Sequence, residues 1–73
     1  MKTDLTQVKP GICPTIIKIN CSPQFCKRLQ ELGVLENTPV RVLKNDFGPI
    51  VLCIFGSRIA IGRNACKQIE VEI

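Results

Sequence analysis

One segment of this sequence carries the signals of a helix, and the rest of the chain has the pattern of short strands. Ser22 is a good N-cap, Pro23 suits the first helical position, and Gly33 is a typical stop. Between them, apolar residues recur at the spacing of one helical face: Phe25, Leu29 and Leu32. A helix of about ten residues does not persist alone in water, so it must pack on the remainder of the fold.

Five short segments outside the helix are expected to form strands. They span residues 12–19, 40–44, 50–55, 58–61 and 69–73. The third is a near-continuous apolar run, typical of a central strand, and Gly56-Ser57 after it is expected to form a two-residue hairpin turn. A chain of 73 residues allows one domain, residues 1–73. The pattern predicts a mainly β fold, a small closed or half-closed barrel of about five strands with one α-helix inserted after the first strand.

The residue inventory argues against catalysis and against export. The chain has no His, so the usual proton shuttle near neutral pH is missing and no imidazole can activate a Cys nucleophile. We therefore expect that the protein is not an enzyme. The first seven residues contain no apolar stretch, and the apolar run at 50–55 is far shorter than the about 20 residues of a membrane span. The sequence predicts a cytoplasmic protein without direct membrane insertion.

Five cysteines in a chain without an export signal are expected to be reduced thiols rather than a disulfide framework. Cys53 and Cys66 lie in apolar segments and are expected to pack as small hydrophobic residues. Cys21 and Cys26 flank the start of the helix, where the positive end of the helix dipole favours a thiolate. With Cys13 they can make a three-thiolate site for a transition metal such as Fe or Zn, the alternative being that all three simply pack.

The formal charge of +4 permits contact with nucleic acid, an anionic membrane face or an acidic partner. No run of five or more Lys or Arg is present, which favours an ordinary solvated surface. Phe25 and Phe55 are expected to be internal, which leaves only Phe47 to stack on a base. We therefore expect no nucleic-acid partner, and a nucleic-acid-binding barrel stays as an alternative hypothesis.

Several short motifs follow one another in a recognisable order. They are RLQELGV at residues 28–34, VRV at 40–42, GPI at 48–50, GSRIAI at 56–61, Ala65, and IEV at 69–71. This series resembles the ferrous-iron transport protein A (FeoA) family from about Leu5 to Ile73. The resemblance implies an SH3-like β-barrel with no required cofactor. It also implies a role in ferrous iron uptake, by docking on the cytosolic, GTPase-bearing part of a membrane transporter.

The same resemblance makes the exposed face of the helix the candidate docking surface. Its charged members are Lys27, Arg28 and Glu31, and its Leu-Gly end is Leu32 and Gly33. The alternative for the last two is that Leu32 belongs to the core and Gly33 only ends the helix. Family members usually have Pro-Gly after the helix where this chain has Glu36-Asn37, and Asn tolerates the positive φ that such a turn requires.

Overall fold

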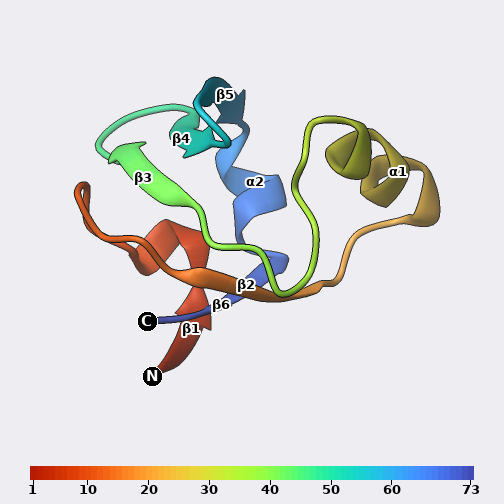
Figure 1. Ribbon diagram of the computed structural model, residues 1–73, viewed down its shortest axis with the longest axis horizontal. Coiled ribbons are helices and arrows are strands. Elements are labelled where there is room, and N and C mark those ends of the chain that lie inside the picture. The colour runs from red at the N-terminus through yellow and green to blue at the C-terminus, as the bar shows by residue number, and fades with distance from the viewer.

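The computed structural model describes residues 1–73 and consists mainly of short antiparallel strands (Figure 1). In chain order the elements are β1 (Lys2–Asp4), the 3-10 helix η1 (Leu5–Gln7), β2 (Thr15–Ile19), α1 (Pro23–Glu31), β3 (Arg41–Lys44), β4 (Ile50–Ile54), β5 (Ser57–Ile61), α2 (Arg63–Cys66) and β6 (Ile69–Glu72). The mainly β class with one principal helix is confirmed.

The structure has one strand more than the sequence pattern predicts. β1 pairs with β6, with Thr3 opposite Val71 at the centre of the match. The helix α1 therefore follows the second strand rather than the first. Three residues are too few to show an alternating pattern, so β1 becomes a strand only because β6 offers it an edge.

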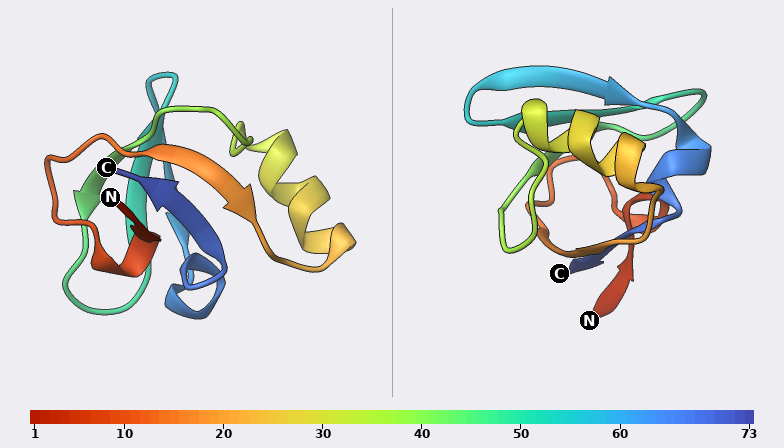
Figure 2. Two further views of the ribbon diagram at one scale, coloured as in Figure 1. Left: turned by 90° about the horizontal axis from the view of Figure 1, so that it is seen from below. Right: turned by 90° about the vertical axis from the view of Figure 1, so that its right-hand side faces the viewer.

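The strands form two three-stranded sheets, with the orders β1-β6-β2 and β3-β4-β5. The chain on either side of the helix joins them, because residues 11–16 exchange backbone hydrogen bonds with residues 37–42. One of these bonds runs from Ile16 N to Thr38 O at 2.9 Å. The two sheets thus curve around a common interior as a half-closed barrel, and the two views in Figure 2 show this arrangement.

The interior of the barrel holds one cluster of fourteen buried apolar residues. The two central strands contribute alternate positions to it, since every second residue of β4 and of β6 is buried. The central place expected for the strand after Pro49 is confirmed. Cys53 is only half-buried, contrary to the expectation, because it occupies the intervening face of β4.

The turn between β4 and β5 differs from the expected one by a single residue. It consists of Phe55 and Gly56, with φ angles of 50° and 82°, and Ile54 pairs with Ser57 across it. Two consecutive positive φ angles define the type I′ turn that suits the twist of a hairpin. The strand register sets the position of this turn, because a shift by one residue would move the Ile54 side chain from the buried face of β4 to the exposed face. Phe55, expected to be internal, is 82% exposed at the tip.

The helix α1 begins where the sequence predicts. The Ser22 hydroxyl accepts a hydrogen bond from Phe25 N at 3.3 Å, and Pro23 occupies the first helical position. Only Leu29 of this helix is fully buried, and Figure 2 shows α1 to one side of the sheets. No helix in the structure is long and apolar enough to cross a membrane.

The loop after α1 contains a residue with positive φ. Asn37 has a φ of 65°, as expected for the residue that replaces Gly in the family pattern.

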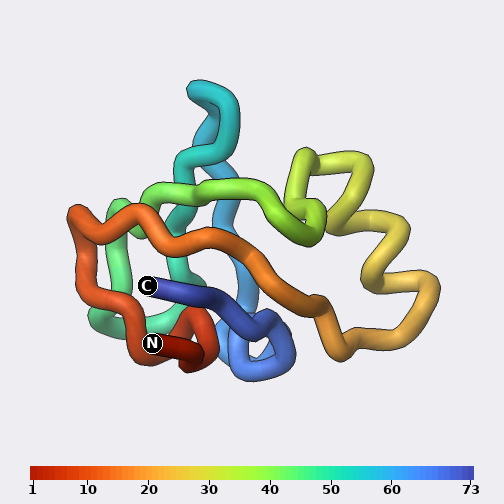
Figure 3. The backbone as a smooth tube through the Cα atoms, turned by 60° about the horizontal axis from the view of Figure 1, so that its bottom comes forward, coloured from red at the N-terminus to blue at the C-terminus, as the bar shows by residue number.

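The N- and C-termini lie side by side, as the tube in Figure 3 shows. The Met1 amino group donates to Ile73 O at 3.1 Å and forms an ion pair with Glu72.

Candidate functional site

The three charged residues predicted for the docking surface all lie on the exposed side of α1. Lys27, Arg28 and Glu31 are exposed, and none of them takes part in an ion pair. Their spacing places them on neighbouring turns of one helical face. Charges without intramolecular partners are available to an incoming molecule, so this face can recognise a charged surface.

The end of α1 turns Leu32 outward and the next apolar residue inward. Gly33 N donates to Gln30 O at 3.0 Å and Val34 N to Leu29 O at 2.8 Å, which together form a Schellman motif. Val34 and Leu29 are buried, whereas Leu32 is 51% exposed. The alternative that Leu32 belongs to the core is therefore wrong.

Gly33 does more than end the helix. Its φ is +93°, a conformation that L side chains rarely adopt, and it lies against the β4–β5 hairpin. A methyl group at Gly33 would be 3.4 Å from Ile54 Cγ2 and 3.6 Å from the Phe55 ring. The end of α1 thus lies in van der Waals range of the hairpin tip, and the positive φ rather than lack of space favours glycine at this position.

Phe55 is the surface residue that sequence reasoning missed. The φ of 50° lies in the left-handed region, where a bulky side chain is an outlier and Asn or Gly is usual in this turn. The available signal was an aromatic residue directly before Gly56, between two apolar strands, which fits the first position of an X-Gly turn. A conformation that costs about 1–3 kcal/mol and displays an aromatic ring is typical of a functional site.

A groove of 190 Å³ opens between α1 and β5 beside these residues. It is lined by Phe25, Arg28, Leu29, Leu32, Ala60, Ile61 and Gly62. We call this groove, together with Gly33 and Phe55, the helix–hairpin surface. Its floor is mostly apolar and Arg28 stands at its edge, so it can hold an apolar side chain whose neighbour carries a negative charge.

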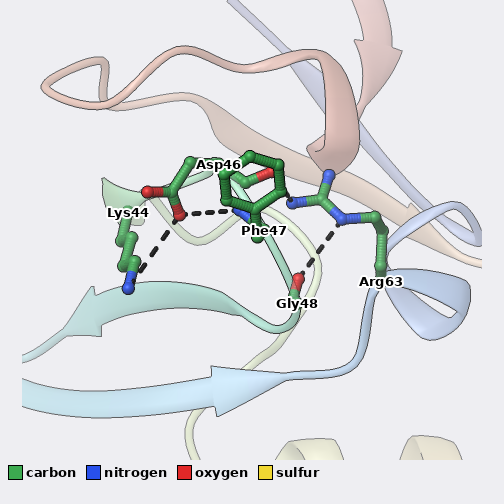
Figure 4. Close-up of polar contacts among 5 residues, drawn as sticks. All are labelled: Lys44, Asp46, Phe47, Gly48 and Arg63. Carbon is green, nitrogen blue, oxygen red and sulfur yellow. Dashed lines mark hydrogen bonds and ion pairs between the residues drawn. The ribbon is translucent and has the colours of Figure 1, made fainter.

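A second exposed aromatic residue, Phe47, lies in the turn at the opposite end of β4. It is 88% exposed, and Arg63 holds the turn by donating to Asp46 O and Gly48 O, each at 3.2 Å (Figure 4). The Asp46 carboxylate accepts from Phe47 N at 2.7 Å. Because the full length of β4 separates Phe47 from Phe55, the two rings do not form one continuous platform.

The three cysteines predicted to bind a metal do not come together. Cys21 and Cys26 are neighbours, with Cys26 Sγ 3.5 Å from Cys21 O, but Cys13 lies beyond the other end of β2. No group of three or more Cys, Asp or Glu side chains is placed to hold a metal ion. The three-thiolate site is therefore not formed, because β2 is an extended strand that keeps its ends apart.

The environment of Cys21 also differs from the expectation of a thiolate at a helix start. Burial raises the pKa of the Cys21 thiol, and the neighbouring Cys26 raises it further through its charge and a hydrogen bond between the side chains. These effects act against the helix dipole, which favours the charged form. Cys21 is thus held as a neutral thiol.

Cys66 is buried as expected, and its environment makes fold stability depend on pH. Burial raises the pKa of this thiol from 9.0 to about 11, although the Arg63 charge acts in the opposite direction. The unfolded chain therefore releases the proton at a lower pH than the folded chain. The stability contributed by the neutral thiol is complete below pH 9 and is lost as the pH rises through 11.

We expect the free energy of unfolding to fall by about 3 kcal/mol over this interval, at about 1.4 kcal/mol per pH unit. Urea unfolding at several pH values from about 8 to 11 measures the fall. The Cys66→Ala variant is the control, because it keeps the titrating lysines and lacks the buried thiol. Parallel pH profiles for the two proteins would contradict the assignment to Cys66.

The fold and the surface together define a small β-barrel module that presents an apolar helix–hairpin surface with a basic edge. The FeoA domain model matches residues 3–73. A protein named Fe(2+) transport protein A from Methanocaldococcus jannaschii is 32% identical over 68 residues, which cover 93% of this chain and 83% of that protein. The chain belongs to the FeoA domain family.

Solved structures agree with this membership. A crystal structure described as an iron uptake regulatory protein (FeoA) superposes with a TM-score of 0.88 at 25% identity, covering 99% of this chain and 96% of the other. The solution structure of FeoA from Chlorobium tepidum gives a TM-score of 0.87 at 25% identity, over 97% of this chain and 70% of that one. A manganese-dependent transcriptional repressor, 23% identical with a TM-score of 0.87 over 41% of its length, shares the fold.

Proposed function

We propose that this protein is an accessory module of ferrous iron transport that docks its helix–hairpin surface on the cytosolic, GTPase-bearing part of the membrane transporter. Family membership and the name of the curated relative support the link to Fe(2+) transport. The observation that carries the docking is a pair of exposed apolar side chains on either side of Gly33: Leu32 precedes Gly33 in the chain, and the ring of Phe55 lies against it. The proposed action is contact rather than catalysis.

The apolar pair supports docking because large apolar side chains seldom stay exposed together without a partner. Leu32 points outward although the Schellman motif directs its neighbours Leu29 and Val34 into the core. Phe55 holds an unfavourable backbone conformation although Asn suits the same turn better. Aromatic residues at the centre of an interface commonly carry much of the binding free energy.

The charge of Arg28 beside the groove indicates which charge a partner would carry. Arg28 lines the groove and has no ion-pair partner within the chain. Arginine is enriched at binding hot spots because its planar guanidinium pairs with carboxylates in a defined geometry. We therefore propose that an acidic group of the transporter meets Arg28 while an apolar side chain enters the groove.

Replacing Arg28 by glutamate is expected to weaken binding to the purified cytosolic domain of the transporter by about 10-fold or more, because attraction becomes repulsion. Calorimetric titration of that domain with the wild-type protein and with Arg28→Glu measures the difference.

The matched control is Lys9→Glu, which makes the same change of charge at an exposed site. Lys9 follows Val8, whose carbonyl oxygen accepts from Asn45 beside the Phe47 turn, so it lies away from the helix–hairpin surface. The control separates a local contact from a general effect of net charge. Equal affinities for the wild type and Arg28→Glu would remove the helix face from the proposed docking surface.

A further inference from the structure

Two of the five cysteines lie next to each other at the root of α1. With Ser22 as the N-cap, Cys21 precedes the cap and Cys26 is the fourth helical residue. Side chains at these two positions commonly pack together in what is called a hydrophobic staple. Here both members of the staple are thiols, so the contact that fixes the start of the helix can also become a covalent bond.

The contacts of Cys26 place its sulfur against Cys21. Cys26 Sγ lies 3.5 Å from Cys21 O and 3.9 Å from Ile19 O. Cys26 also raises the pKa of the Cys21 thiol, the effect expected of a neighbouring ionisable group. A disulfide needs Cα atoms within about 4.4–6.8 Å and side chains that face each other, and residues at the two staple positions commonly pack side chain to side chain.

Both thiols can be reached from solvent, by different routes. Cys26 lines a groove of 380 Å³ between β2 and α1, together with Lys18 and Gln30. Cys21 lines a separate groove of 400 Å³ on the side of α2. A small molecule can therefore reach Cys26 through one groove while Cys21, which lines the other groove, stays close to it.

We propose that Cys21 and Cys26 form a dithiol site that closes to an intramolecular disulfide on reaction with a low-molecular-weight disulfide such as oxidised glutathione. In the first step the Cys26 thiolate attacks one sulfur of the reagent. The reagent's S–S bond breaks, a mixed disulfide forms on Cys26, and one thiolate leaves and takes up a proton.

In the second step Cys21 loses its proton and attacks the Cys26 sulfur. The mixed disulfide breaks, the Cys21–Cys26 bond forms, and the second reagent thiolate leaves and is protonated. The protein loses two electrons and two protons, and the reagent gains them as two thiols. Cys26 acts first because the pKa of Cys21 is raised, which leaves less of that thiol in the reactive thiolate form.

The bond would tie the end of β2 to the first turn of α1. Leu29 is the one fully buried residue of this helix, so a covalent link at its N-terminal end adds a second fixed point to α1. An effect of the disulfide on docking rests on the proposed function above. The formation of the bond does not, and it is tested without any transporter.

The test uses the full chain with Cys13→Ser and Cys53→Ser, which leaves the pair and the buried Cys66. The reduced protein is incubated with oxidised glutathione, free thiols are blocked with N-ethylmaleimide, and the products are digested with trypsin. Cleavage after Lys18 and Lys27 places both cysteines in one peptide, residues 19–27. We expect this peptide to carry neither label nor glutathione and to be lighter than the reduced peptide by two hydrogen atoms.

The matched controls are the same protein with Cys21→Ser and, separately, with Cys26→Ser. Cys21→Ser is expected to accumulate a mixed disulfide on Cys26. Half-conversion of the intact pair to its disulfide is expected at an oxidised glutathione concentration at least about 10-fold lower than the concentration that half-converts Cys21→Ser to its mixed disulfide. The reason is that the second step of the intact pair is intramolecular. Circular dichroism of each variant checks that the barrel is folded. If residues 19–27 stay doubly labelled, or carry two glutathiones without an internal bond, the proposed site is overturned.

Discussion

Replacing Phe55 by asparagine is expected to strengthen the fold and to weaken docking at the same time. Asn-Gly is the preferred pair for a type I′ turn, so the change removes the unfavourable backbone conformation of Phe55, with an expected gain of about 1 kcal/mol in unfolding free energy. The loss of an exposed aromatic anchor is expected to cost about 2 kcal/mol of binding, or about 30-fold in affinity for the transporter's cytosolic domain. Urea unfolding and calorimetric titration measure the two effects separately.

Phe47 provides the matched control for this variant. It is exposed to a similar degree, but Arg63 holds its turn at the other end of β4, away from α1 (Figure 4). Phe47→Asn is expected to leave the affinity for the transporter unchanged. An equal loss of binding in both variants would show that exposed aromatic residues matter in general, and a full affinity in Phe55→Asn would exclude Phe55 from the interface.

The second large effect is expected in the core. Replacing Leu29 by alanine removes the one fully buried side chain of α1 and leaves a cavity where the helix meets the sheets. Leu-to-Ala changes at such sites cost about 2–5 kcal/mol, which is a large part of the about 5–15 kcal/mol that stabilises a small domain. Urea unfolding followed by circular dichroism measures the loss.

Leu32→Ala is the control for this substitution, since it makes the same chemical change three residues further along the chain. Leu32 is half-exposed, so its truncation is expected to cost less than about 1 kcal/mol of stability. The same variant is expected to weaken docking, in contrast to its small effect on the fold. Similar losses of stability for both variants would mean that α1 packs through a broader face than the structure shows.

Local signals were enough to predict the helix and most of the strands. Ser22, Pro23 and Gly33 set the ends of α1 through capping and chain geometry, which depend on residues close in sequence. Asn37 adopted the expected positive φ for the same reason. Motif order then pointed to the family that the comparisons confirm.

The sequence-based predictions that proved wrong concern features that depend on pairing between distant segments. β1 is a strand only through its match with β6, and the hairpin turn is placed by the register that keeps Ile54 buried. The expected grouping of three thiolates does not form, because an extended β2 separates Cys13 from Cys21 and Cys26 at its other end. Spacing along the chain says little about distance when an extended strand lies between the residues.

The sequence by itself determined the β class, the bounds of the helix and the charged face that α1 presents. Only the tertiary structure decided which apolar side chains stay outside. Leu29 and Val34 enter the core while Leu32 does not, and Phe55 projects from the hairpin tip beside Gly33. The physical reason is that capping acts within a few residues. Exposure depends on how two sheets and a helix close around one core, and that packing joins segments far apart in the chain.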